Sequence, residues 1–423
     1  MQMMEKPQNW IDWRNYIETG NLYPAFQPVV SIESGLVYGY EVLGRIEHTR
    51  NIAGKEKKVE SSLGNFFLTY PNKSYSSESF LRLKKSVDEE IRRLAIEKFA
   101  REAEPQASLF LNISPSSIFS YMEIINKDLP LTIQLTRKHG INPKRIIVEI
   151  TEERIDGNIE VLKPIIDIYR SEGFRIAVDD VGSESSNLDR IGLFHPDIIK
   201  VDLQMIRRSV FSRNFKEILF TLSKLGESLG SSLLFEGIEK EDELYNALNY
   251  GSRFLQGYYF SEAKREFIDS TNFKQDLNLS LEKYYRKKTN EILKLNAWES
   301  KIQKSLSTLD LKYLSLENQD LIKEHLINSN ISFFRLYITD SKGIQVSPNY
   351  VKIDDVVSEI SEYKGKNWSW RPYFFEHKYK SSQNQIDWVI SSVYHDISEN
   401  TFLKTFSKNL EGGLILFIDV IFD

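Results

Sequence analysis

The sequence predicts an α/β fold, an irregular TIM-like (βα)8 barrel followed by a connecting helix and a small α+β domain. Between Phe26 and Phe260, short β-branched apolar runs alternate with amphipathic stretches, which is typical of a parallel sheet with crossover helices. Charged and amide side chains stand near the C-terminal ends of several of these runs. Because active sites of parallel barrels lie at that edge, these side chains are expected to meet at one mouth.

Eight runs have the length and composition of barrel strands. They are Ala25–Val30, Val37–Ile46, Leu109–Ile113, Arg145–Ile150, Arg175–Val181, Ile198–Leu203, Leu233–Ile238 and Phe254–Phe260. The first two are separated only by Ser31 to Leu36, which is too short for a helical crossover. We therefore expect one antiparallel hairpin at the start of the barrel. Apolar residues at three- and four-residue steps predict a helix over Ser79–Ala103.

The pattern changes after Phe260. A polar stretch leads into a helical seam formed by Leu281, Tyr285, Ile292, Leu295 and Ile302. Lys288 and Glu299 interrupt this seam, so two interpretations stay open: it pairs with a partner helix, or it lies against its own domains.

The C-terminal region begins at about Ser307 with helical segments and ends in strands. The strand candidates are Phe333–Ile338, Trp388–Val393 and Leu414–Val420. Asp340 to Gly343 predicts a turn, because Asp and Gly tolerate its backbone angles. We divide the chain into a barrel over residues 1–268, a connecting helix over 269–306 and a small α+β domain over 307–423.

Composition excludes several classes of protein. The 423 residues are 41% hydrophobic, enough for more than one packed core, and contain no cysteine, which excludes disulfides, thiolate nucleophiles and Cys-based zinc sites. A net charge of -5 argues against long nucleic acid, although a small phosphorylated ligand bridged by cations is compatible. Trp, Asp and Arg interrupt the first twenty residues, and no run approaches the ~18 apolar residues of a membrane span, so we expect a cytoplasmic protein.

Several charged residues stand inside or directly after buried strands. Glu149 lies within an apolar run, where a carboxylate needs an internal ion pair or a bound cation. Asp179 and Asp180 repel each other and a divalent ion relieves this, although one of them could cap the next helix. Lys200 could form a salt bridge to a neighbouring strand.

Taken together, these residues occur in strand order at matching depth, which independent ion pairs would not be expected to do. The set is Glu41, Asn112, Glu149, Asp179, Asp180, Lys200 and Glu236. None of the six histidines occupies an equivalent position, which argues against a zinc hydrolase or a Ser-His-Asp enzyme. Oxygen ligands without imidazole favour magnesium or manganese.

A succession of motifs over roughly residues 20 to 265 resembles the EAL-domain cyclic di-GMP phosphodiesterases. The motifs, in order, are Phe26-Gln27-Pro28-Val29, Glu41-Val42-Leu43-Gly44-Arg45, Asn112-Ile113-Ser114, Glu149-Ile150-Thr151-Glu152, Asp179-Asp180-Val181-Gly182, Lys200-Val201-Asp202, Glu236-Gly237-Ile238-Glu239 and Gln256-Gly257-Tyr258. The resemblance implies hydrolysis of cyclic di-GMP to linear pGpG by a water activated between two divalent cations, Mg²⁺ or Mn²⁺. It also implies a homodimer.

The resemblance implies a role for each matching residue. One metal would be held by Glu41, Asn112, Glu149 and Asp179, and the second by Asp179, Asp180 and Glu236. The implied catalytic and supporting residues are Lys200, Glu239, Glu152 and Gln256. The positions implied to contact the dinucleotide are Gln27, Glu41, Leu43, Arg45, Asp202 and Gln256.

The loop after the acidic pair departs from the family pattern. Glu184 replaces a glycine and Ser185 replaces an aromatic residue, which removes backbone freedom and adds charge near the implied metals. In the family this loop is anchored by the glutamate that Glu152 matches. Two functions therefore stay open: a phosphodiesterase, or a receptor that binds cyclic di-GMP with weak or no hydrolysis.

The C-terminal region resembles the PAS/Cache-like sensor domain that follows an EAL barrel in a Bacillus-type subgroup. Lys366 to Phe374 and the preceding Tyr337 to Asp340 carry this resemblance. Trp368, Trp370, Arg371 and Tyr373 would line a pocket for a small acid, or would fill a core with Arg371 in a salt bridge. The resemblance implies that this domain regulates the barrel.

Overall fold

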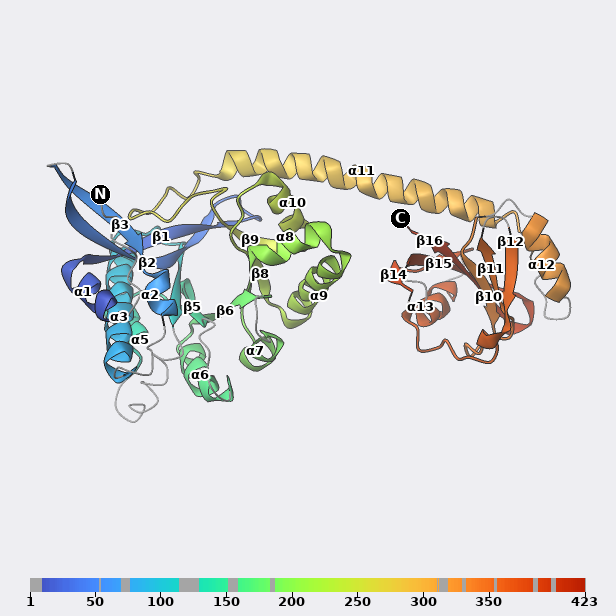
Figure 1. Cartoon of the computed structure of the whole chain (residues 1–423), viewed down its shortest axis with the longest axis horizontal. Coiled ribbons are helices and arrows are strands. Elements are labelled where there is room, and N and C mark those ends of the chain that lie inside the picture. Colours follow the sequence, from blue (N-terminus) through green and yellow to red (C-terminus); the bar gives the residue numbers. More distant parts are fainter. Residues whose placement is uncertain are drawn as a thin grey trace. The chain divides into compact units, whose positions relative to one another are not determined.

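A computed structural model describes residues 10–52, 55–69, 77–113, 129–150, 159–182, 187–309, 311, 319–328, 332–353, 356–382, 387–396 and 401–422. The chain divides into two compact units, Met1–Tyr285 and Arg286–Asp423, and each is described by itself (Figure 1). No helix among these residues combines the length and the apolar character needed to cross a membrane.

The first unit is a closed barrel with helices around it. Its strands are β1 (Asn21–Ser31), β2 (Val37–Ile52), β3 (Lys55–Ser62), β4 (Ser108–Ile113), β5 (Ile146–Ile150), β6 (Arg175–Val181), β7 (Ile198–Val201), β8 (Ser232–Phe235) and β9 (Ser252–Gln256). Its longer helices are α1 (Trp10–Thr19), α3 (Ser77–Glu102), α5 (Leu131–Lys138), α6 (Lys163–Ser171), α7 (Asn187–Phe194), α8 (Leu203–Phe211), α9 (Arg213–Leu229) and α10 (Glu241–Asn249). A single-turn helix α2 (Gly64–Leu68) follows β3.

The strand order is β1-β9-β8-β7-β6-β5-β4-β2-β3, and an additional pairing of β1 with β2 closes the barrel. β1 runs antiparallel to both β2 and β9, whereas the pairings from β2 through β4 to β9 are parallel. The predicted irregular barrel with an initial antiparallel hairpin is therefore confirmed.

The strand predictions missed β3 and placed the ends of β7, β8 and β9 too late. β3 was not predicted, because its residues are mostly polar and exposed and it pairs only with the extended end of β2. The last strand was predicted to reach Phe260, but it ends at Gln256. Gly257 ends it with φ +153, and a Cβ at this position would lie 2.1 Å from the carbonyl oxygen of Ile238.

Two apolar layers hold the barrel together. The outer layer packs the helices against the sheet, and on β5 it uses Ile146, Val148 and Ile150. The inner layer fills the bottom of the barrel with Val29, Phe110, Ile147, Ala177, Ile198, Leu234 and Phe254. Because side chains alternate along a strand, the residue two positions after an inner-layer residue also points into the barrel. This alternation decides where the polar site lies.

The second unit is an antiparallel sheet with the order β12-β11-β10-β16-β15-β13 and β14 paired to β15. Its strands are β10 (Arg335–Thr339), β11 (Asn349–Ile353), β12 (Val356–Ile360), β13 (Val389–Ile390), β14 (Tyr394–His395), β15 (Phe402–Asn409) and β16 (Ile415–Ile421). One face, with Leu336 and Ile338, packs with the end of α11 (Lys274–Leu306) and α12 (Gln319–Asn328). Tyr337 points to the other face and packs with residues of α13 (Pro372–Ser381). The predicted separate C-terminal domain, expected as a small α+β domain, is confirmed and is rich in β-strands.

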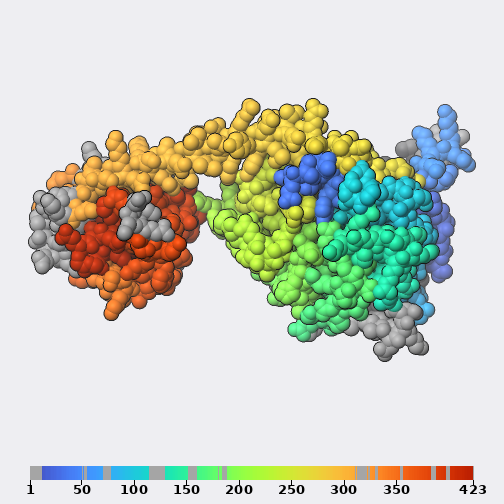
Figure 2. Space-filling view, turned by 180° about the vertical axis from the view of Figure 1, so that it is seen from behind, coloured from blue at the N-terminus to red at the C-terminus, as the bar shows by residue number. Residues whose placement is uncertain are grey.

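The predicted turn and seam have clear outcomes. Asp340 accepts hydrogen bonds from the backbone of Lys342 and Ile344, and Gly343 has φ +87, so the turn forms as predicted. In the seam on α11, Leu281 packs against the barrel core and Ile302 against the C-terminal core. Tyr285 and Ile292 between them are exposed, and Figure 2 shows the middle of α11 in yellow, uncovered on the face in view. A partner helix for this seam stays a prediction.

Candidate functional site

The polar side chains at the barrel mouth follow from the strand alternation. On six parallel strands the residue two positions after an inner-layer residue is polar, which gives the pairs Phe110/Asn112, Ile147/Glu149, Ala177/Asp179, Ile198/Lys200, Leu234/Glu236 and Phe254/Gln256. β1 runs the opposite way, so Gln27 precedes Val29 by two. The barrel therefore carries one polar ring directly above an apolar plug.

Lys200 is fully buried at the centre of this ring. Its Nζ lies 2.9 Å from Glu149 Oε1, 3.1 Å from Asp179 Oδ1, 3.2 Å from Glu236 Oε1 and 3.7 Å from Glu41 Oε2. One ammonium thus faces four carboxylates from four other strands or strand ends. The carboxylates outnumber the ammonium, so this buried ring carries an excess of negative charge when they are ionised.

Two amides fix the carboxylate of Glu41. Asn112 Nδ2 donates to Glu41 Oε1 at 3.0 Å, and Gln256 Nε2 donates to Glu41 Oε2 at 2.6 Å. Gln256 Nε2 also contacts Gln27 Oε1 at 3.2 Å. Both oxygens of Glu41 are therefore oriented before any ligand arrives.

Burial and mutual repulsion perturb the acids and the lysine. Burial raises the pKa of Glu149 well above its usual range, although Lys200 opposes the shift. Burial also raises the pKa of Glu236, with a further contribution from Asp179. Burial alone would lower the pKa of Lys200, but the surrounding carboxylates outweigh it and hold that pKa well above its ordinary value. The lysine therefore keeps its proton.

The buried carboxylate oxygens of this ring indicate, independently of any sequence pattern, that it can hold a divalent cation. Glu149 Oε2 is buried and has no hydrogen bond among the described residues, and Glu149 Oε1 and Glu236 Oε1 are buried with only the ammonium of Lys200 beside them. Buried carboxylate oxygens without donors are costly, and a hard cation satisfies them. Within the described residues, no group of three or more His, Asp or Glu side chains is placed to hold a metal ion as it stands, and the ammonium of Lys200 occupies the space among the carboxylates.

The other predicted residues occupy the rim. Arg45 on β2 donates to the carbonyl of Gly44 at 3.1 Å and to Ser62 Oγ at 3.3 Å. Leu43, on the same strand, is half-buried. Asp202 caps α8 by accepting from the backbone of Gln204 at 2.5 Å. The side chain of Asp180 and the whole of Glu152 lie outside the described residues.

The sequence analysis did not identify the residues that hold Glu239 in place. Arg207 on α8 donates to Glu239 Oε2 and to Glu243 Oε1, both at 2.9 Å. Glu243 Oε2 accepts from the backbone N–H of Glu239 at 2.8 Å and of Lys240 at 3.2 Å, which holds the segment after β8 in place. The available signal was the acid at the third position of α10, a common helix-start pattern.

Comparison with known proteins identifies the chain. The EAL domain model matches residues 11–263, and the model of the EAL-domain associated signalling protein domain matches residues 267–423. The chain is a member of the EAL-domain family. The resemblance found in the sequence motifs is thus confirmed.

Relatives of this EAL-domain chain cover different shares of it. The EAL-domain protein YkuI of Bacillus subtilis is 32% identical over 409 residues, which are 95% of this chain and 94% of YkuI. The crystal structure of YkuI in complex with the substrate c-di-GMP and calcium matches with a TM-score of 0.79 at 29% identity, over 99% of this chain and 100% of YkuI. The probable cyclic di-GMP phosphodiesterase PdeG of Escherichia coli is 28% identical over 258 residues, 58% of this chain and 45% of PdeG.

Proposed function

We propose that this chain binds cyclic di-GMP at the barrel mouth and hydrolyses one phosphodiester bond to give linear pGpG. The observation that carries the proposal is the convergence of Glu41, Glu149, Asp179 and Glu236 around Lys200, with an excess of acid that matches paired cations. The complex of YkuI with c-di-GMP and calcium supports the choice of ligand. We also propose that the chain is a homodimer and that the C-terminal unit regulates the barrel.

The residues that would hold two divalent cations, Mg²⁺ or Mn²⁺, are Glu41, Asn112, Glu149, Asp179, Asp180 and Glu236. Bound cations would supply positive charge to the attacking and leaving oxygens and would lower the pKa of water. The hydrogen bonds from Asn112 and Gln256 prepare Glu41 for this role, because they fix the direction of its carboxylate.

Lys200 and the rim residues would act on the substrate. Lys200 stays protonated, so it donates to the attacking water and to a phosphate oxygen. Among the described residues, Arg45 has only neutral hydrogen-bond partners, which leaves its guanidinium charge for a phosphate. Gln27, Leu43 and Asp202 would contact the rest of the dinucleotide, and Glu239, held by Arg207, would support the segment after β8.

The second candidate function is a receptor that binds cyclic di-GMP with weak or no hydrolysis. Glu184 and Ser185 in the altered loop favour it, and both lie outside the described residues. The same metal and dinucleotide contacts would then serve binding alone.

The test measures binding and turnover on one preparation. The full chain is mixed with cyclic di-GMP and Mg²⁺, Mn²⁺ or a chelator; affinity is measured by calorimetry and linear pGpG by chromatography. Cation-dependent pGpG supports the enzyme. Binding without product favours the receptor, and absence of binding contradicts both functions.

A further inference from the structure

The C-terminal unit contains a small aromatic cavity on the sheet face that α13 covers. Its walls include Tyr337, Tyr363, Trp368, Arg371, Tyr373 and Tyr394, and its volume is about 20 Å³. A space of this size holds about one water molecule, so it accepts one oxygen atom of a carboxylate and not the whole group. None of the residues proposed for the barrel mouth lines this cavity.

Arg371 brings an unsatisfied cation to this cavity. Its Nε is buried without a hydrogen bond, and it forms no ion pair with a described carboxylate. Its Cζ lies 4.4 Å from the ring centre of Trp370 and 5.9 Å from that of Tyr394. Rings against its faces leave the in-plane N–H groups for a planar acceptor. The alternative of a salt bridge at Arg371 is therefore not found among the described residues.

The neighbouring acids are already engaged by a different arginine. Arg335 donates to Asp419 Oδ2 at 2.8 Å and to Asp396 Oδ2 at 2.7 Å. Asp419 also accepts from the hydroxyl of Tyr394 at 3.0 Å. Both carboxylates are therefore engaged by Arg335, although Asp396 and Arg335 also line the cavity.

Two tyrosines supply a further donor. The hydroxyl oxygens of Tyr337 and Tyr373 lie 2.8 Å apart, so one hydroxyl hydrogen is used between them. Neither hydroxyl has another acceptor in the described part of the chain, so the second hydrogen is available to a ligand oxygen. Burial raises the pKa of Tyr373 to about 12 and that of Tyr337 above its ordinary value, so both hydroxyls stay protonated.

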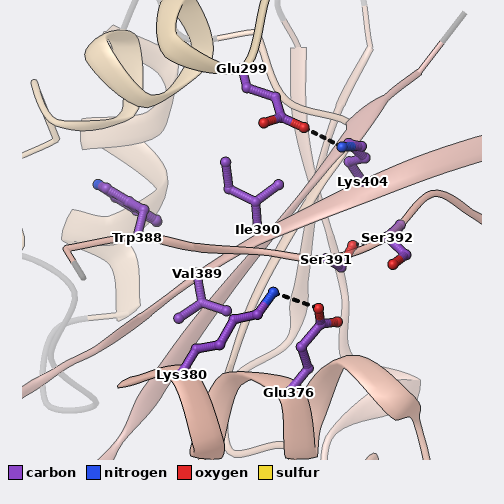
Figure 3. A pocket seen from close by; sticks show the side chains of 9 residues that line it. All are labelled: Glu299, Glu376, Lys380, Trp388, Val389, Ile390, Ser391, Ser392 and Lys404. Carbon is purple, nitrogen blue, oxygen red and sulfur yellow. Dashed lines mark hydrogen bonds and ion pairs between the residues drawn. The ribbon is translucent and has the colours of Figure 1, made fainter. Parts of the chain in front are cut away.

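A wider hollow in the same unit lacks these properties. It has a volume of about 430 Å³ and lies beside the edge strand β13, where Figure 3 shows its two lysines. Lys380 pairs with Glu376 at 2.7 Å and Lys404 pairs with Glu299, so both cations are neutralised (Figure 3). A lysine of this hollow, Lys380, therefore provides a control for the loss of one positive charge.

The predicted pocket residues are thus partly confirmed. Trp368, Arg371 and Tyr373 line the cavity as the sequence suggested. Trp370 does not line it: the side chain is exposed and stacks on Arg371 instead.

We propose that this cavity receives one carboxylate oxygen of a small organic acid. Arg371 forms the ion pair through its in-plane N–H groups, and the free hydroxyl hydrogen of the Tyr337/Tyr373 pair donates to the same carboxylate. The rings of Trp368 and Tyr394 contact the apolar part of the acid.

The experiment titrates the full chain with formate, acetate and propionate at constant ionic strength and follows tryptophan fluorescence and ligand-observed NMR. Acetamide, which has the shape of acetate without its charge, is the matched ligand. We expect saturable binding of at least one acid and none of acetamide. Arg371→Gln should weaken binding by about tenfold or more, since a hydrogen bond to a charged group is lost. Lys380→Gln, in the wider hollow, should bind as the wild type does.

Three results would overturn the proposal. They are no saturation by any of the three acids, equal binding of acetamide, and wild-type affinity in Arg371→Gln. The comparison of acetate with acetamide needs no variant, so it decides the matter even if Arg371→Gln fails to fold.

Discussion

Replacing Lys200 by Met tests the electrostatics of the barrel mouth. The substitution keeps the apolar stem and removes the ammonium, which lies within 3.7 Å of four carboxylates. Removing one partner of a buried ion pair costs about 3–5 kcal/mol. For a unit of this size, that corresponds to a fall in Tm of roughly 6–20 °C. The expected loss applies to the metal-free protein near neutral pH.

The assay is thermal unfolding of the full chain with a chelator and with Mg²⁺. Because a divalent cation can replace the lost charge, Mg²⁺ should raise the Tm of Lys200→Met more than that of the wild type. The deficit should also shrink as the pH falls, since the raised pKa values of Glu149 and Glu236 let the folded state take up protons first. The control is Lys224→Met, which removes an exposed pair with Glu227. That pair is worth only about 0.3–0.5 kcal/mol.

A Tm of Lys200→Met within about 2 °C of the wild type in chelator would refute this reasoning. It would mean that the four acids do not depend on the ammonium. The cluster would then carry too little charge to attract cations.

Three further changes test separate parts of the molecule. Glu41→Ala removes the carboxylate held by two amides, so it should abolish pGpG formation and weaken Mn²⁺ binding; wild-type turnover would contradict its role. Arg45→Ala should weaken cyclic di-GMP affinity by roughly tenfold or more, because a charge-assisted phosphate contact of ~1.5–3 kcal/mol is lost, and an unchanged Kd would remove it from the site. Burial lowers the pKa of His377, so the C-terminal unit should lose stability as the pH falls below about 6.5, and His377→Gln should flatten this dependence in thermal unfolding. An equal slope in both proteins would exclude His377 as the cause.

The sequence predicted the barrel well where one physical rule dominates. Runs such as Ile146–Ile150 are buried on both faces, and their apolar pattern identifies them without tertiary information. β3 escaped prediction because its side chains are exposed and its existence depends on pairing with β2. The end of β9 escaped because the aromatic residues after Gly257 read as strand, whereas the close approach of Ile238 forces a turn.

For the site, the order of the motifs along the sequence predicted which residues meet. It did not predict how the charges of the acids and of Lys200 offset one another. Lys200 forms the salt bridges considered for it, and its partners are the acids that are proposed to hold cations, whereas its catalytic role stays a prediction. Its central position depends on the inward register of five strands, which no local pattern contains. Arg207 was missed for a similar reason: its partner Glu239 is 32 residues away and only the fold brings them together.

The most direct test of the central claim is a titration of Mn²⁺ into the full chain in the presence of cyclic di-GMP, read by electron paramagnetic resonance. The account predicts two bound ions per chain in the wild type and weaker binding in Glu149→Gln, which keeps the shape of the side chain and loses its charge. Absence of saturable Mn²⁺ binding in the wild type, or identical binding in Glu149→Gln, would contradict a cation site at the barrel mouth.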